Sequence, residues 1–260
     1  MSDLKQQAIV IGGVNYSDSS RVLWLITPEF GRQSMMVKGA RRARSRFAGR
    51  METFNLLEVV YRKSRSGNLH TLREADVQNQ FPGLRANLEA FMAASGAVEM
   101  IKNVAPEDQE CGVLFQLLED FLCCADESAG EEGMPTLLLA VFRWRLLNLL
   151  GLEPQLVDCI GCGQQLERCE SYRFLPASGG VVCPDCAGDP KNAAGRPLMI
   201  GYAALRFIYR SGRKFPLDRE ELSILSAEEL EQAQRAAERY SAYHLGEKVP
   251  GGLDKQANKG

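Results

Sequence analysis

Five short runs of strand-forming residues lie within the first 80 residues, and they limit the fold of this part of the chain more than any other feature. The runs read AIVIGGVNY, RVLWLITP, RQSMMVKG, FNLLEVVYRK and LHTLREADV, with turn-forming or polar residues between them. Five strands in about 75 residues predict a small closed barrel. We expect this barrel to occupy residues 1–80.

The interval between the third and fourth runs is the longest and contains the sequence VKGARRARSRFAGR. An oligonucleotide-binding (OB) barrel commonly inserts a helix at this point, so the pattern favours an OB fold. In such a helix Arg42, Arg46 and Arg50 would share one face because they are spaced by four, and Phe47 and Met51 would turn elsewhere.

Charge is distributed unevenly along the chain. The first 80 residues hold 13 Lys and Arg against 7 Asp and Glu, a balance of +6, whereas the whole chain carries -2. Six basic side chains without an acidic neighbour repel one another and attract a polyanion, which predicts a nucleic-acid contact; the alternative is a solvated loop. The candidate DNA-binding residues are Lys38, Arg41, Arg42, Arg44, Arg46 and Arg50.

Bases of single strands stack on aromatic side chains, so such rings would complement the charge. We expect Trp24, in the apolar run VLWLI, to lie in the core rather than to serve as a stacking platform. The aromatic residues available in the expected barrel are Tyr16, Trp24, Phe47, Phe54 and Tyr61.

Helical spacing of apolar residues replaces the strand pattern from Pro82 onward. Helices are expected from Pro82 to Pro106, around residues 114–122, from Pro135 to Leu150, from Tyr202 to Gly212 and from Ser226 to Gly246. Ser226 and Glu229 form the pattern of a capping box. The sequence thus predicts an α+β multidomain protein, with helical parts at 81–155 and 191–246, an insert at 156–190 and a flexible tail at 247–260.

The insert contains two C-x2-C pairs separated by 20 residues. Zinc takes four ligands tetrahedrally, and four thiolates leave no open coordination position, so this spacing predicts one structural Zn2+. A metal-free dithiol pair is the alternative, and Cys169 is an alternative ligand. Cys111, Cys123 and Cys124 fall on an expected helix, where they favour core packing. The expected zinc ligands are Cys159, Cys162, Cys183 and Cys186.

Motifs for catalysis are missing from the sequence. It contains no phosphate loop, no G-x-G-x-x-G, no H-E-x-x-H and no G-x-S-x-G. His70 and His244 are expected to be structural or solvated, and the absence of a K-x-D-G lysine sets aside a nucleotidyl-transferring ligase. We therefore expect a protein that is not an enzyme. The apolar run from Leu137 is interrupted by Arg143, so we expect no membrane span and a cytoplasmic location.

Taken together, these segments resemble the RecO family of bacterial recombination mediators. The similarity rests on the acidic-serine turn before the second run, on T-P-E-x-G-R, on K-G-A-R-R, on FRWRLLNLLG, on the two C-x2-C pairs and on YSAYHLGEK. The resemblance implies an N-terminal OB barrel, a helical C-terminal domain with the zinc insert, and no enzymatic turnover. Some family members lack the zinc cysteines, which implies that the metal has a structural role and is not essential to the shared activity.

The resemblance also implies a function in DNA repair and a nucleoid-associated location. Members of the RecO family bind single- and double-stranded DNA and anneal complementary strands. They bind the acidic C-terminal tail of the single-stranded-DNA-binding protein, and they work with RecR to load RecA. Arg143 in FRWRLLNLLG matches a family arginine near the pocket for the acidic tail. A barrel with a zinc module is also common in RNA- or ribosome-associated adaptors, which is the alternative function.

Overall fold

The structure is a computed structural model that describes residues 3–64, 67–188, 197–218, 220 and 225–246. The chain forms two compact units, Met1–Leu139 and Ala140–Gly260. The flexible tail expected at 247–260 lies outside the described residues.

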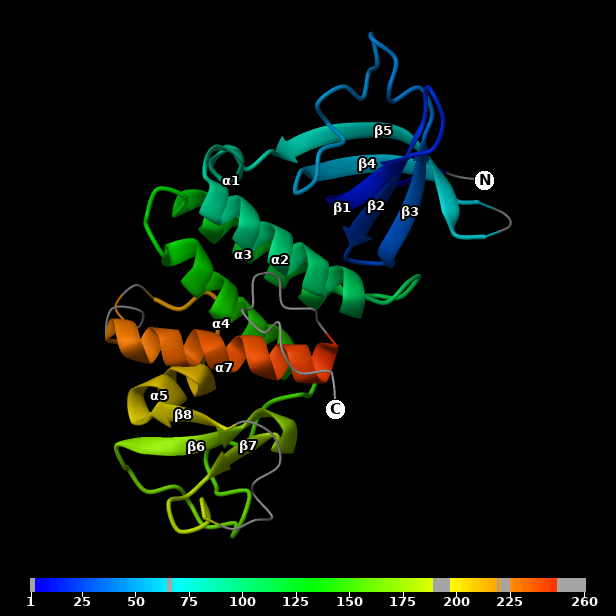
Figure 1. The fold of residues 1–260 in the computed structure, drawn as a ribbon. Helices are drawn as coiled ribbons and strands as arrows, with labels where there is room; N and C mark the ends of the chain where they lie inside the picture. Colours follow the sequence, from blue (N-terminus) through cyan, green and yellow to red (C-terminus); the bar gives the residue numbers. More distant parts are fainter. Residues whose placement is uncertain (1–2, 65–66, 189–196, 219, 221–224, 247–260) are drawn as a thin grey trace, which may run out of the picture. The chain divides into compact units, whose positions relative to one another are not determined.

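Five strands form a closed barrel at the start of the first unit (Figure 1). The order around the barrel is β1-β2-β3-β5-β4, and only the β3–β5 pair is parallel. This arrangement is the Greek-key barrel of the OB type, so the fold expected for the N-terminal part is confirmed. The strands are β1 (Leu4–Asn15), β2 (Arg21–Thr27), β3 (Gly31–Val37), β4 (Leu56–Arg62) and β5 (Leu69–Asn79).

Alternate residues of each strand point into the barrel, as the period of two in strand side chains requires. Leu23 and Leu25 of β2, for example, are fully buried. They belong to the same core cluster as Leu57 and Val59 of β4, which are also fully buried. Residues from the long β3–β4 connection complete this core.

Gly31 at the β2–β3 turn shows why a glycine is needed there. Its φ of 60° is left-handed, and a Cβ at this position would collide with the backbone carbonyl of Pro106. The adjacent Arg32 N–H donates to that carbonyl at 2.8 Å, and Arg32 Nη1 donates to the carbonyl of Lys102 at 2.8 Å. The turn is thereby held against the end of helix α2 (Leu88–Val104) and the segment that follows it.

Helices make up the rest of the first unit. The expected helix from Pro82 to Pro106 is divided into α1 (Pro82–Ala86) and α2, because Asn87 adopts an extended backbone and its side chain accepts from the Ala90 N–H at 2.9 Å. Two further helices follow, α3 (Gly112–Glu127) and α4 (Met134–Leu149), and α4 runs through the boundary between the units.

The second unit contains a small sheet that the sequence pattern did not predict. Its strands are β6 (Ser171–Leu175), β7 (Gly180–Val182) and β8 (Leu198–Gly201), in the order β7-β6-β8. A short 3-10 helix, η1 (Pro176–Ser178), connects β6 to β7. The cysteine insert is therefore paired through β6 with residues beyond position 190.

Two helices pack with this sheet, α5 (Tyr202–Ser211) and α7 (Ala227–Leu245). An aromatic cluster joins the elements, since the Trp144 ring lies 5.5 Å from Tyr240 and 6.3 Å from Phe174. The expected capping box is confirmed: the Ser226 hydroxyl accepts from the Glu229 N–H, and Glu229 accepts from the Ser226 N–H. No helix in the described ranges has both the length and the apolar character needed to cross a membrane.

Candidate nucleic-acid interface and candidate metal centre

The connection from Lys38 to Asn55 carries the six basic residues, and we refer to Lys38–Arg50 as the cationic segment. The prediction of a helix in this segment is wrong. The segment is a series of turns, in which the Ser45 N–H donates to the Arg42 carbonyl at 2.9 Å and the Ala48 N–H donates to the Ser45 carbonyl at 3.2 Å. Gly39 and Gly49 have φ values of 74° and 70°, which a right-handed helix excludes.

Two apolar residues anchor the cationic segment to the barrel. Phe47 and Met51 are only 4% and 3% exposed and belong to the core cluster that also contains Leu23 and Leu57. Their burial fixes the chain on both sides of Arg50, so the neighbouring arginines extend from an anchored segment. Phe47 and Met51 turn into the barrel core without a helix, and the Arg46 guanidinium lies 4.9 Å from the centre of the Phe47 ring, so Phe47 is not separated from all the arginines as expected.

The basic side chains differ in their contacts. Arg41 Nη1 donates to the carbonyl of Ser17 at 2.9 Å, which ties the segment to the β1–β2 turn. Arg50 pairs with Asp76 at 2.9 Å, so its charge is already compensated. Within the described part of the chain, no carboxylate pairs with the other five, all of which are exposed: Lys38, Arg41, Arg42, Arg44 and Arg46.

Asn55 and Arg85 support the segment, and sequence reasoning missed both. The Asn55 side chain is 1% exposed and donates to the carbonyls of Gly49 at 3.2 Å and Arg50 at 3.0 Å. Arg85 of α1 donates to Asn55 Oδ1 at 2.7 Å and to the Thr53 carbonyl at 2.8 Å. The only signal in the sequence was a polar residue just before an apolar strand, which does not reveal a partner 30 residues away.

The aromatic residues of the barrel are mostly unavailable for stacking. Phe47, Phe54 and Tyr61 are buried, whereas Tyr16 is 67% exposed on the β1–β2 turn. The prediction that Trp24 lies in the barrel core is wrong, because Leu23 and Leu25 on the opposite strand face fill the core. Trp24 is half-buried on the outer face, with the Lys102 ammonium 5.7 Å from its ring centre.

Four cysteine sulfur atoms come together in the second unit, and all lie within 4.8 Å of one another: Cys159, Cys162, Cys183 and Cys186. Four sulfurs around one zinc at about 2.3 Å would be roughly 3.8 Å apart, and the Sγ atoms of Cys162 and Cys183 are separated by 3.9 Å. The donor set and its spacing therefore fit one tetrahedral metal ion.

Backbone N–H groups favour a thiolate at this centre. Burial raises the pKa of Cys159, but N–H donors from Cys183, Cys162 and Gly161 outweigh burial and lower it to about 6. Two of these donors lie 3.2 Å and 3.3 Å from Cys159 Sγ. Cys169 is not among the four, and its Sγ donates to the Ser171 carbonyl at 3.1 Å.

The remaining candidates lie in well-packed surroundings. Arg143 is 9% exposed on α4, with Nη1 3.7 Å from a carboxylate oxygen of Glu238 on α7. His70 is buried, and its Nδ1 accepts from the Ser64 N–H at 3.3 Å. His244 Nε2 lies 3.1 Å from the Pro176 carbonyl. Cys111 is buried at the start of α3, whereas Cys123 and Cys124 are half-buried.

The barrel, its cationic connection and the four-cysteine centre in a separate helical unit define a class of protein: an OB-barrel protein joined to a helical unit that can hold a metal. The family model described as Recombination protein O N terminal matches residues 1–81, and Recombination protein O C terminal matches residues 85–251. The chain belongs to the RecO family of DNA repair proteins, and its role is in recombination and repair.

Similar proteins agree with this assignment over most of their length. A protein named DNA repair protein RecO from Desulfosudis oleivorans is 30% identical over 250 residues, 94% of each chain. One of the same name from Syntrophus aciditrophicus is 26% identical over 245 residues, 94% of this chain and 92% of the relative. Another, from Roseiflexus, is 32% identical over 204 residues, 78% of this chain and 69% of the relative.

Proposed function

We propose that this protein is a DNA-binding recombination mediator, in which the cationic segment contacts the phosphates of single- and double-stranded DNA. The observation that carries the proposal is the anchoring of Phe47 and Met51 in the barrel core while Arg42, Arg44 and Arg46 stay exposed. Cationic side chains on an anchored segment lose less freedom on binding than those on a free loop, so more of their attraction to phosphate is retained.

Electrostatics support the same location. The exposed cations of the segment have no carboxylate partner among the described residues, so they must attract counterions that a phosphate chain can replace. Arg50 is an exception, since Asp76 already neutralises it. We propose that Arg50 chiefly holds the segment in place and adds less to DNA binding than its five neighbours.

A recombination mediator binds other proteins as well as DNA. We propose that the protein anneals complementary strands, binds the acidic C-terminal tail of the single-stranded-DNA-binding protein, and works with RecR to load RecA onto covered single strands. The location would be the bacterial nucleoid. Family membership supports this role, and no covalent chemistry is part of it. The tail contact is assigned to Arg143, where a tail carboxylate would take the place of Glu238.

The four-cysteine centre would hold one Zn2+ with a structural role. Cys159, Cys162, Cys183 and Cys186 would occupy all four positions of a tetrahedral ion, leaving none for a substrate. Such an ion stabilises the protein by linking the segment before β6 to the turn after β7. We therefore propose that the metal maintains the second unit and takes no direct part in DNA binding.

The experiment that tests this function is a salt titration of labelled single-stranded DNA binding to the full-length protein. Five or six phosphate contacts predict that log K falls with log salt at a slope of roughly -4. Structured RNA is added as a competitor in parallel. A steep slope with weak RNA competition supports the proposal, whereas a flat slope contradicts it, and preferential RNA binding would favour the RNA-associated adaptor.

A further inference from the structure

Helix α5 presents an unusual outer face. Residues Tyr202, Arg206, Tyr209 and Arg213 follow one another at spacings of four, three and four, which places them along one side of the helix and its C-terminal turn. The opposite side contains the buried Ala204 and Ile208, and the buried Leu205 and Phe207 flank the outer face. Aromatic rings and guanidinium groups therefore alternate along the face that does not pack into the protein.

The cations of this face lie against the rings. The Arg206 Cζ atom is 5.9 Å from the centre of the Tyr202 ring, and Arg168 contributes a second guanidinium at 5.2 Å from the same ring. Farther along, Arg213 stacks over Tyr209 at 3.5 Å. Each tyrosine is thus paired with at least one arginine, in a geometry suited to cation–π attraction.

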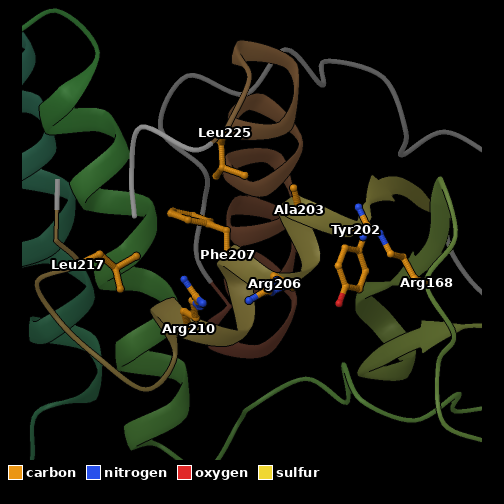
Figure 2. A pocket seen from close by; sticks show the side chains of 8 residues that line it. All are labelled: Arg168, Tyr202, Ala203, Arg206, Phe207, Arg210, Leu217 and Leu225. Carbon is orange, nitrogen blue, oxygen red and sulfur yellow. The ribbon is translucent and has the colours of Figure 1, made fainter. Parts of the chain in front are cut away.

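Arg168 and Arg206 also line a pocket with an apolar floor. In Figure 2, Arg206 lies between Arg210 and Tyr202, and Arg168 lies beside the Tyr202 ring. Phe207 and Leu217 supply apolar surface to this pocket, which has a volume of about 250 Å³. A second hollow, which also contains Tyr209, shares Tyr202 and Arg206 with it, so the two hollows form a continuous surface.

Two guanidinium groups of this surface are placed to contact an anionic ligand. In the part of the chain that the structure describes, no carboxylate pairs with Arg168 or Arg206. Acidic groups are present nearby: Glu153 pairs with Arg213, and Glu170 and Glu229 line the hollow beside Tyr202. Glu153 therefore offsets Arg213, and the guanidinium groups of Arg168 and Arg206 are the cations that an anionic ligand would meet beside the Tyr202 ring.

We propose that this surface, formed by the outer face of α5 and Arg168, binds single-stranded nucleic acid. Guanidinium groups would contact phosphates, while Tyr202 and Tyr209, about 10 Å apart along the helix, would each stack on an unpaired base. Duplex DNA would leave the rings unused because its bases are stacked on one another. An acidic peptide would need the cations and the apolar floor but not the repeat of rings.

This surface would hold the second of the two strands during annealing. The inference rests on the proposed function, because the first strand is held on the cationic segment of the barrel. Charges on α5 would screen the phosphates of the incoming strand and stacking would keep its bases unpaired. The protein would then hold two strands by separate surfaces on separate units.

The test compares two matched variants of the full-length protein. The test variant carries Arg168→Gln, Arg206→Gln and Tyr209→Leu, and the control carries Arg235→Gln, Arg239→Gln and Tyr243→Leu on α7. Annealing of complementary strands is timed, and photoreactive single-stranded DNA is cross-linked and its contact peptide mapped. We expect annealing to slow by about tenfold in the test variant only, with cross-links in Tyr202–Ser211.

Two further measurements make the outcome decisive. Tyr209→Phe alone should anneal normally because it retains the ring, and an Asp-rich peptide should not displace the cross-linked DNA. Equal annealing by both triple variants, or absence of cross-links on α5, would overturn the inference. Displacement by the peptide would mean that the surface binds a protein tail instead. The proposed function is tested separately, by measuring whether charge reversal in the cationic segment abolishes binding of single-stranded DNA.

Discussion

The guanidinium of Arg85 donates to the side-chain oxygen of Asn55 at 2.7 Å, and this contact links helix α1 to the residue that supports the cationic segment. Asn55 in turn donates to the backbone carbonyls of Gly49 and Arg50. The conformation of the arginine-bearing turns is therefore set by a polar network around the buried Asn55 as well as by the barrel core.

Replacing Asn55 with Ala should lower both stability and DNA affinity. The change leaves the carbonyls of Gly49 and Arg50 and the guanidinium of Arg85 without their buried partner, at a cost of about 2 to 3 kcal/mol in the free energy of unfolding. Denaturant unfolding and DNA titration measure the two effects. Arg85→Met should weaken DNA binding by a similar mechanism, and normal affinity in both variants would show that the network does not shape the DNA-binding surface.

Loss of one metal ligand should affect the second unit but not the barrel. Cys183→Ser should reduce bound zinc from one ion per chain to none and lower the stability of the second unit by several kcal/mol. Cys169→Ser is the matched control and should retain the ion. Metal analysis and thermal unfolding give the readouts, with single-strand affinity measured in parallel. Zinc retained by Cys183→Ser, or lost from Cys169→Ser, would contradict the ligand set.

Stability of the barrel should decrease in mild acid because of His70. Burial lowers the pKa of His70 below its usual 6.5; Asp108 raises it and Lys63 lowers it by smaller amounts. As the pH falls below about 6.5, the unfolded chain therefore takes up a proton before the folded protein does, and the free energy of unfolding decreases until the lower folded pKa is passed. His70→Gln should flatten this slope below about pH 6.5 in denaturant titrations; an unchanged slope would assign it to other groups.

The Arg143–Glu238 pair gives a two-way test of the acidic-tail contact. If a tail carboxylate replaces Glu238, then Glu238→Gln should tighten binding of the tail peptide and Arg143→Gln should weaken it by at least about tenfold. Peptide binding is measured by calorimetry. Weakening by both substitutions would indicate that the pair is structural and that the tail binds elsewhere.

Local patterns in the sequence predicted the elements whose signals are short-range. Alternation of apolar residues found all five barrel strands, and Ser226 with Glu229 located the start of α7. The C-x2-C pairs identified the four sulfurs that the fold brings together, because metal ligands keep a fixed spacing within each turn. These features are determined by residues within a few positions of one another.

Features that depend on distant partners could not be predicted in the same way. The spacing of arginines by four suggested a helix, but burial of Phe47 and Met51 in the barrel and the bond of Arg50 to Asp76 determine a series of turns instead. Pairing of β6 with β8 joins residues across an insert, and apolar spacing cannot reveal it. The alternation of Tyr and Arg on α5 was visible in the sequence, but its meaning depended on Arg168 reaching Tyr202.

The most direct test of the central claim is the affinity of single-stranded DNA for a variant with Arg42→Glu, Arg44→Glu and Arg46→Glu. Its control, with Lys5→Glu, Arg62→Glu and Arg235→Glu, has the same change in net charge at exposed side chains outside the cationic segment. We predict a loss of at least about 100-fold for the first variant and a small loss for the control, with a shallower salt slope only in the first. Wild-type affinity in the first variant, or equal losses in both, would contradict a DNA-binding role for the cationic segment.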